Sequence, residues 1–246
     1  MIEKEQRLLA EVLDLFAQKF ADRAILRGGM VLCLLGSLRL TNDLDYVFVP
    51  YKSKKDIVKD IVVCLQSLRQ VSIEHSINSK CLRILITREA TTVQVEAKVA
   101  MQVKASTTST RLFSPKFQLP PRLILVDDYS VALANKMAAW NERRLMRDVY
   151  DIWFYRQMNI APDSKTLLGR LAKPSYSHLV ATEDYFTGRT ERDFLEFLRE
   201  KVNQLSDKDI AKELSDYLPP EEIPGLAMQI RASLAKMSTS TQYWKN

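Results

Sequence analysis

Two acidic residues near the N-terminus are the residues of this chain best suited to metal chemistry. Asp43 and Asp45 begin an apolar run and are separated by one residue, so in a strand their side chains project from the same face. Neighbouring carboxylates repel each other unless a cation lies between them, and Mg²⁺ accepts such oxygen ligands. The pair therefore predicts a metal site. The alternative is that both residues, with Asn42, form a turn before the strand.

A pair of glycines precedes these acids. Gly28 and Gly29 lie between the short apolar stretch 24–26, which we expect to be a strand, and residues 30–38, which we expect to be a short helix. A glycine turn that leads into a helix presents backbone N–H groups and a positive dipole end, which suits a phosphate. A phosphate cradle followed by an acidic pair on the adjacent strand is typical of a phosphoryl- or nucleotidyl-transfer site.

A third carboxylate is available on another predicted strand. Residues 91–99 alternate between apolar and polar side chains, and Glu96 lies on the polar face with Gln94 and Lys98. If this strand lies beside residues 43–49, Glu96 would join the acidic pair and help to hold a second metal ion. The alternative is an exposed strand residue that interacts with its polar neighbours.

A cluster of charges lies about ninety residues further along the chain. Lys136, on a predicted helix, could reach a triphosphate and offset its charge. Asp148 and Asp151 follow on a second predicted helix, where the i,i+4 spacing would pair them with Arg144 and Arg147. By spacing alone, a plain ion-paired helix surface is the favoured interpretation of this cluster.

The hydrophobic periodicity changes near residue 120, which predicts two domains and an α+β fold. Residues 1–120 are expected to form a small mixed β-sheet core with flanking helices, and residues 121–246 a helical domain that completes the active site. Residues 101–118 are weakly patterned and predict a loop or edge segment. The other elements expected from periodicity and turn residues are helices over 3–22, 52–70, 129–141, 144–158, 164–172, 191–205, 207–217 and 221–235 and a strand over 82–87.

Composition narrows the classes of function. With 246 residues, 46% hydrophobic, 27% charged and a net charge of +6, the chain is typical of a cytoplasmic globular protein with a mild preference for anionic partners. No secretory signal is evident, and no apolar run is long enough to span a membrane. Three cysteines without metal-ligand spacing are expected to be reduced. Only two histidines, His75 and His178, are present, and we expect both at the surface rather than in a catalytic triad or zinc site.

Two motifs, taken together, resemble those of a known family. The first is Leu26-Arg27-Gly28-Gly29 followed by Asp43-Leu44-Asp45, with Arg39 and Thr41 between them. The second is Lys136-Met137-Ala138 followed by the segment Arg147-Asp148-Val149-Tyr150-Asp151-Ile152-Trp153. Their order and separation resemble those of the AbiEii-type nucleotidyltransferase toxins, which belong to the DNA polymerase β-like nucleotidyltransferase superfamily.

The resemblance implies a role for each matching residue. Asp43 and Asp45 match the metal-binding pair. Gly28 and Gly29, with Arg39 and Thr41, match the loop that binds the nucleotide phosphates. Lys136 matches the lysine that contacts the nucleotide, and Asp148 and Asp151 match the acidic positions of the last motif. One of the last two is expected to assist catalysis, and Asp151 is preferred. The family usually has Ser or Thr where this chain has Met30, so the phosphate cradle is expected to work through backbone N–H groups.

The resemblance also implies an activity. We expect an enzyme that uses an NTP with Mg²⁺ or Mn²⁺ and transfers the nucleotide to an RNA acceptor, the 3′ end of tRNA. This transfer would block translation. The protein would then be the toxin of a toxin–antitoxin or phage-defence pair, with a cognate antitoxin protein as its partner. Three alternatives stay open. They are nucleotidylation of a protein or of a small molecule such as an aminoglycoside, a non-catalytic nucleotide-binding module, and an unrelated protein with chance motifs.

Overall fold

The computed structural model describes residues 2–175, 180, 182 and 184–239. The chain forms two compact units, residues 1–128 and residues 129–246. Because β7 belongs to the sheet of the first unit, that unit continues past residue 120, where the sequence analysis places the boundary.

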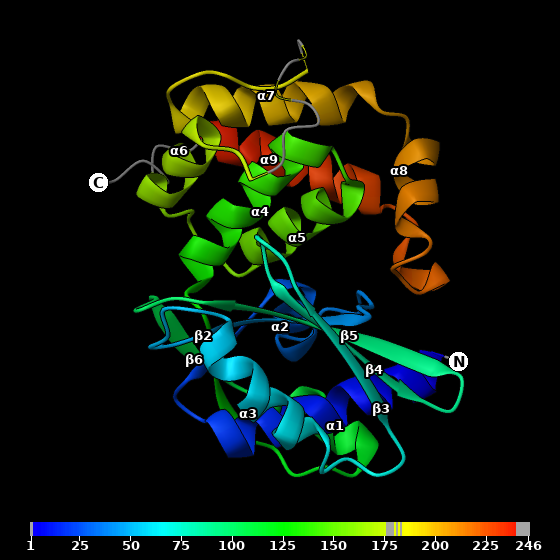
Figure 1. Ribbon diagram of the computed structural model, residues 1–246. Coiled ribbons are helices and arrows are strands. Elements are labelled where there is room, and N and C mark those ends of the chain that lie inside the picture. The colour runs from blue at the N-terminus through cyan, green and yellow to red at the C-terminus, as the bar shows by residue number, and fades with distance from the viewer. Residues whose placement is uncertain (1, 176–179, 181, 183, 240–246) are drawn as a thin grey trace. The chain divides into compact units, whose positions relative to one another are not determined.

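A seven-stranded mixed sheet organises the first unit (Figure 1). Its strands are β1 (Ala24–Arg27), β2 (Asp43–Phe48), β3 (Ser72–Ile77), β4 (Leu82–Arg88), β5 (Thr91–Val99), β6 (Ala105–Ser109) and β7 (Leu123–Asp127). Their order is β3-β4-β5-β2-β1-β7-β6. The pairs β2/β5 and β1/β7 are parallel, and the other neighbouring pairs are antiparallel.

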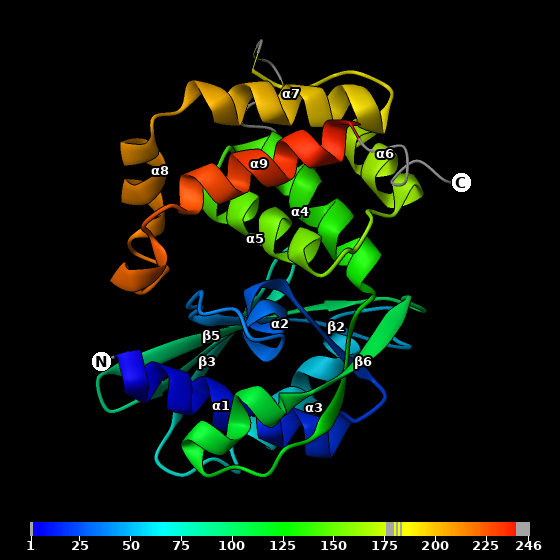
Figure 2. The ribbon, with the colours of Figure 1, turned by 180° about the vertical axis from the view of Figure 1, so that it is seen from behind.

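Helices α1 (Ile2–Phe20) and α3 (Lys55–Leu65) lie on one face of this sheet, as Figures 1 and 2 both show. The ring of Phe16 on α1 lies 5.1 Å from that of Tyr46 and 6.0 Å from that of Phe48, measured between centroids. Because side chains alternate along a strand, the even-numbered residues of β2 face α1 and pack in the core. Asp43 and Asp45 therefore project from the opposite face of the sheet.

The remaining short elements of the first unit connect the strands. Helix α2 (Gly28–Leu34) joins β1 to β2, and the 3₁₀ helices Thr110–Leu112 and Ser114–Phe117 join β6 to β7. Strand β6, at one edge of the sheet, falls within the segment predicted to be a loop or edge. Strand β3, at the other edge, was not predicted, because its side chains are mostly exposed and do not alternate in polarity.

Helices form the second unit. They are α4 (Tyr129–Arg143), α5 (Met146–Gln157), α6 (Ser164–Ala172), α7 (Glu191–Gln204), α8 (Asp207–Leu214), the 3₁₀ helix Pro220–Glu222, and α9 (Leu226–Thr239). Figure 2 shows α9 beside α5 and α7. Side chains cap three of the helices: Asp163 bonds to the Thr166 N–H, Thr190 to the Asp193 N–H, and Ser206 forms a capping box.

The mixed sheet with its helices, followed by helical segments, confirms the predicted α+β class. Within the described ranges, none of the helices has the length and apolar character needed to cross a membrane. Cys33, Cys64 and Cys81 form no disulfide within the described ranges. Burial raises the pKa of the Cys64 thiol to about 11.

Candidate active site

Gly28 and Gly29, at the junction of β1 and α2, form a glycine corner against which several side chains pack. Gly28 has φ of +72°, a conformation that favours glycine. A Cβ at Gly28 would overlap the carboxylate of Asp45, and a Cβ at Gly29 would overlap the guanidinium of Arg39 and crowd Thr41. The glycines therefore bring three of the predicted site residues, Asp45, Arg39 and Thr41, against the backbone that links β1 to α2. The sequence alone predicts only a phosphate-binding role for these glycines.

Asp43 and Asp45 occupy the same face of β2, as predicted, and both are half-buried. The Thr41 hydroxyl donates a hydrogen bond of 2.7 Å to Asp43 Oδ1. Both acids lie inside the strand rather than in a turn before it, because Asp43 pairs with Gln94 of β5. The Thr41 bond orients one carboxylate, and the Gly28 contact limits where the other can lie.

A row of charged residues crosses five strands of the sheet through Asp45. In the ladder, Arg83 of β4 pairs with Glu96 of β5, Glu96 with Asp45 of β2, and Asp45 with Arg27 of β1. The row continues to Asp127 of β7, whose carboxylate accepts a hydrogen bond from Arg27 Nε. The structure therefore places Glu96 directly beside Asp45 and on the same face of the sheet, where the sequence analysis expects it.

The carboxylate of Glu96 also has partners of its own. Gln94 Nε2 donates a 2.9 Å hydrogen bond to Glu96 Oε1, and Arg83 Nη2 lies 3.4 Å from the same oxygen. The polar-neighbour alternative for this residue is thus also realised in part. Among the described residues, no three His, Cys, Asp or Glu side chains converge as a metal-binding group.

The carboxylates of Asp43 and Asp45 nevertheless fit a Mg²⁺ ion that takes its other ligands from the substrate and from water. Mg²⁺ is commonly held by one or two carboxylates, with substrate phosphates and water as its other ligands. Asp43 and Asp45 supply two half-buried carboxylates side by side, and Gly28 leaves room for one of them. The residues present therefore fit a two-carboxylate site to which the substrate contributes.

From the sequence, Asp127 is a candidate cap for the helix that begins near residue 129, but it lies in a strand. It ends β7, its side chain is buried, and it forms the ion pair with Arg27. Burial raises the pKa of the Asp127 carboxyl, while the Arg27 guanidinium acts in the opposite direction. Sequence reasoning missed this pair because the two residues lie 100 positions apart.

The second cluster is assembled within the helical unit. Lys136 Nζ on α4 lies 2.6 Å from Asp151 Oδ2 and 3.9 Å from Asp148 Oδ1, both on α5. Arg143, the last residue of α4, holds Asp148 through two hydrogen bonds of 2.7 Å. The structure therefore brings together Lys136, Asp148 and Asp151 with Arg143, a member of the same charged cluster for which the sequence predicts no separate role.

Arg144 and Arg147, which the i,i+4 spacing would pair with Asp148 and Asp151, lie over aromatic rings instead. The Arg144 guanidinium lies 4.2 Å from the ring centroid of Trp140, and that of Arg147 lies 5.5 Å from the ring centroid of Tyr217. Burial lowers the pKa of Arg144 to about 10. The two aspartates thus pair with Lys136 and Arg143 instead of forming a plain ion-paired surface.

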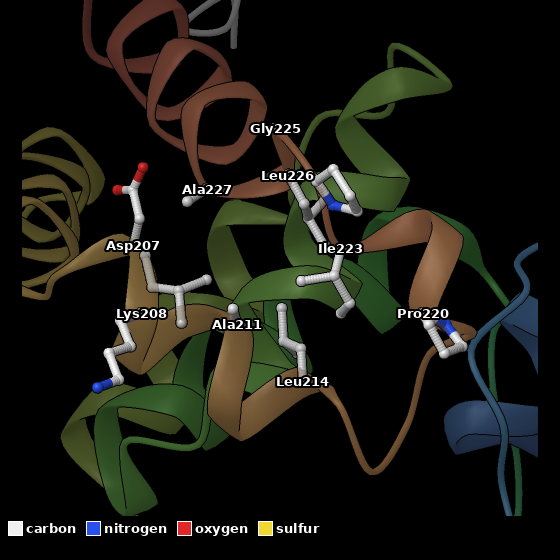
Figure 3. Close-up of a pocket in the computed structure, with 11 residues that line it drawn as sticks. Asp207, Lys208, Ala211, Leu214, Pro220, Ile223, Gly225, Leu226 and Ala227 are labelled. Carbon is white, nitrogen blue, oxygen red and sulfur yellow. The ribbon is translucent and has the colours of Figure 1, made fainter.

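A cavity of the helical unit lies away from these residues. Its volume is about 390 Å³, and it lies between α8 and the start of α9, where Leu214, Ile223 and Leu226 surround it (Figure 3). None of the residues that line it is a predicted site residue. His75 lies exposed on β3, as expected, whereas His178 lies outside the described residues.

Comparison with known proteins identifies the family. A family model described as "Nucleotidyl transferase AbiEii toxin, Type IV TA system" matches residues 7–232. None of the curated proteins matches the chain.

Three solved structures share the fold. JHP933 from Helicobacter pylori is 12% identical with a TM-score of 0.54, over 97% of this chain and 94% of that one. MenT4, a nucleotidyltransferase toxin from Mycobacterium tuberculosis, is 13% identical with a TM-score of 0.57, over 98% and 86%. A putative nucleotidyltransferase from H. pylori is 10% identical with a TM-score of 0.53, over 100% and 98%. Because the family model spans nearly the whole chain, the protein belongs to the AbiEii nucleotidyltransferase toxin family.

Proposed function

We propose that this nucleotidyltransferase is a metal-dependent toxin that transfers a nucleotide from an NTP to the 3′ end of an RNA, with tRNA as the preferred acceptor. One observation supports the metal-dependent step above all others. Asp43 and Asp45 share a face of β2, and the carboxylate of Asp45 lies against the backbone of Gly28. A pair of adjacent carboxylates beside a glycine corner suits a divalent cation and the phosphates that accompany it.

Asp43 and Asp45 would hold Mg²⁺, or Mn²⁺ in its place, and Glu96 is proposed as a further ligand. The ion would supply a Lewis acid that offsets the charge of the triphosphate. Thr41 keeps the Asp43 carboxylate oriented, and Gly28 fixes the space for Asp45. In the reaction, an acceptor hydroxyl oxygen bonds to the α-phosphorus, the bond to the β-phosphate oxygen breaks, and pyrophosphate and the hydroxyl proton leave.

The nucleotide would also meet Gly28, Gly29 and Arg39, with Lys136 as the cation for its phosphates. Met30 has no hydroxyl to offer a phosphate, and its side chain is fully buried in the core. Thr41 provides a hydroxyl beside Gly29 instead. The assignment of Lys136 to the same nucleotide rests on the family resemblance, because the family model spans both motifs.

The family implies an antitoxin partner and an NTP substrate. We propose tRNA as the acceptor because the family resemblance implies it, and the net charge of +6 is compatible with a polyanionic partner. A block of translation would follow, in the cytoplasm and as part of a phage-defence pair. The MenT4 structure is that of a nucleotidyltransferase toxin, which agrees with this proposal at the level of the fold.

A labelling experiment tests the proposal. The full chain is incubated with Mg²⁺, each α-labelled NTP in turn, and total cellular RNA, with and without EDTA. The variant Asp43→Ala/Asp45→Ala removes the proposed metal pair. The variant Asp22→Ala/Asp60→Ala makes the same change of charge at two exposed positions of the same unit and serves as the matched control.

We expect label in tRNA with the wild type and the control, and none with the site variant or with EDTA. Label in protein instead of RNA would show that the acceptor is a polypeptide. Equal labelling by the site variant would refute the assignment of Asp43 and Asp45. Tight NTP binding without any transfer would favour the nucleotide-binding module.

A further inference from the structure

The contact between Arg143 and Asp148 has the geometry of a fixed support. Arg143 Nε donates to Asp148 Oδ2 and Nη2 donates to Oδ1, both at 2.7 Å. A guanidinium that meets both oxygens of a carboxylate fixes its orientation as well as its position. Arg143 ends α4 and Asp148 lies in the first turn of α5. The two residues join these helices at the turn between them.

The carboxylate that Arg143 holds is also a neighbour of Lys136. The Lys136 ammonium lies 3.9 Å from Asp148 Oδ1 and 2.6 Å from Asp151 Oδ2. The two aspartates are three residues apart on α5, so they lie on the same side of the helix. Two cations and two carboxylates balance in charge, and the ammonium has a carboxylate on each of two sides.

Exposure separates the four side chains into two groups. The side chains of Asp148 and Asp151 have 0% of their surface exposed, whereas that of Lys136 has 15% and that of Arg143 has 30%. A substrate phosphate can therefore reach the cations of this cluster but not its carboxylates. Asp148 and Asp151 are thus placed to act through Lys136 rather than on a substrate.

We propose that Arg143 is a positioning residue for Lys136: its guanidinium fixes Asp148, and Asp148 together with Asp151 fixes the ammonium that meets the nucleotide. The inference rests on the proposed function, in which Lys136 binds the triphosphate. It changes the role of Asp148 and Asp151 from catalytic to positioning. A long, flexible lysine side chain held in one place loses less conformational freedom when the phosphate binds.

A simpler role for Arg143 would be to join α4 to α5 without any effect on Lys136. A double-mutant cycle separates the two roles, because residues that act through each other show non-additive effects. The cycle uses Arg143→Lys, Lys136→Ala and the double variant in the full chain. Arg143→Lys keeps the cation but loses the two-pronged contact. The variant Arg143→Gln, which also removes the charge, gives a second measurement.

Arg144 supplies the matched control. It is the next residue, but its guanidinium lies over the rings of Trp140 and Phe197 and donates to the Trp140 and Asn141 carbonyls. Arg144→Lys therefore makes the same substitution without changing a contact of Asp148. For each variant, we would measure the Kd for NTP with Mg²⁺, KM and kcat, and the melting temperature.

We expect Arg143→Lys to weaken NTP binding about tenfold, because a misplaced group loses binding and rate steeply with distance. We expect Arg143→Gln to weaken NTP binding more than Arg143→Lys does, because only the lysine variant keeps a cation beside Asp148. Neither change should weaken binding further once Lys136 is alanine. Arg144→Lys should lower the melting temperature and leave the Kd unchanged.

Two outcomes would overturn the inference and not the function. One is that Arg143→Lys and Arg143→Gln leave the Kd unchanged while Lys136→Ala weakens it. The other is that they weaken binding by the same factor in both backgrounds. If Lys136→Ala itself leaves the Kd unchanged, the proposed nucleotide contact of Lys136 is refuted, and the inference with it.

Discussion

Asp43 and Asp45 of the first unit are half-buried beside Thr41 and Gly28, whereas Asp148 and Asp151 of the second unit are fully buried beside cations. Asp43 is oriented by a neutral hydroxyl, that of Thr41. Asp148 and Asp151 are each within 4 Å of a cation and have no exposed surface. Carboxylates that are accessible and crowded are suited to bind a cation from solution, and carboxylates that are already neutralised are suited to hold a side chain in place. The same residue type thus serves two purposes.

The largest expected effect comes from removing one accessible carboxylate. Asp43→Asn keeps the acceptor for the Thr41 hydroxyl but removes one charge of the metal pair. A catalytic metal contributes several kcal/mol, and each 1.4 kcal/mol is tenfold in rate, so we expect nucleotide transfer to fall by about 10³-fold. The melting temperature without metal should stay the same or rise, because repulsion from Asp45 is relieved.

A binding measurement checks the same prediction without activity. Mg²⁺ that binds the folded chain raises its melting temperature with concentration, and this shift should disappear in Asp43→Asn. Asp60→Asn, on the exposed side of α3, should keep both the shift and the activity. An unchanged metal-dependent shift in Asp43→Asn would remove the contrast between the two sets of carboxylates.

The second expected effect is on stability and concerns a buried carboxylate. Asp148→Asn leaves Arg143 and Lys136 without the charge that balances them. We expect the free energy of unfolding to fall by about 3 kcal/mol, the lower end for a broken buried pair, because Arg143 is partly exposed. Denaturation by urea gives this quantity. Asp207→Asn on α8, which breaks an ion pair between an exposed carboxylate and Arg231 of α9, should cost much less. Equal losses would show that burial does not distinguish the two pairs.

A smaller effect is expected at the glycine corner. Gly28→Ala places a methyl group against the Asp45 carboxylate and strains a backbone with positive φ. Gly225 has a similar φ, +77°, but no atom lies within 4 Å of where its Cβ would be. Both alanine variants should lose about 1 to 2 kcal/mol of stability from the strain. Only Gly28→Ala should also lose nucleotide transfer, measured at a temperature where both variants are folded. Full activity in Gly28→Ala would show that the position of Asp45 is not critical.

The elements that could be predicted from sequence are those whose local pattern matches their environment. The core strands β2 and β5 alternate or run apolar, and α6 was predicted with its observed bounds, Ser164–Ala172. Strand β3 was missed because an edge strand with exposed polar side chains has no such pattern. Strand β7 was missed because a short apolar run does not by itself reveal its partners, β1 and β6.

The site follows the same rule. The order of Gly28-Gly29 and Asp43/Asp45 indicated their proximity, since one short helix links two neighbouring strands. The Arg143–Asp148 contact does not follow the i,i+4 spacing of a continuous helix, because the chain turns between α4 and α5. Sequence reasoning therefore chose Arg144, whose own side chain packs on Trp140.

The last prediction concerns an ion pair in the first unit, where burial and charge compete. Burial raises the pKa of Asp127 above its ordinary value of 3.8, despite the Arg27 guanidinium. Between 3.8 and the folded-state pKa, the unfolded chain has released a proton that the folded chain retains. The stability that Asp127 contributes is therefore complete below 3.8 and is lost as the pH rises through the folded-state pKa.

Asp127→Asn removes the titrating carboxyl, so a comparison of the wild type with this variant isolates the contribution of Asp127 to stability. The difference in unfolding free energy, wild type minus variant, should decrease as the pH rises from about 3.5 to 7, since the other carboxylates cancel in the difference. Urea titrations at several pH values measure it. A difference that increases with pH would mean that Arg27 stabilises the carboxylate more than burial destabilises it. Asp127 would then resemble the balanced aspartates of the helical unit, and the contrast between the two units would be confined to Asp43 and Asp45.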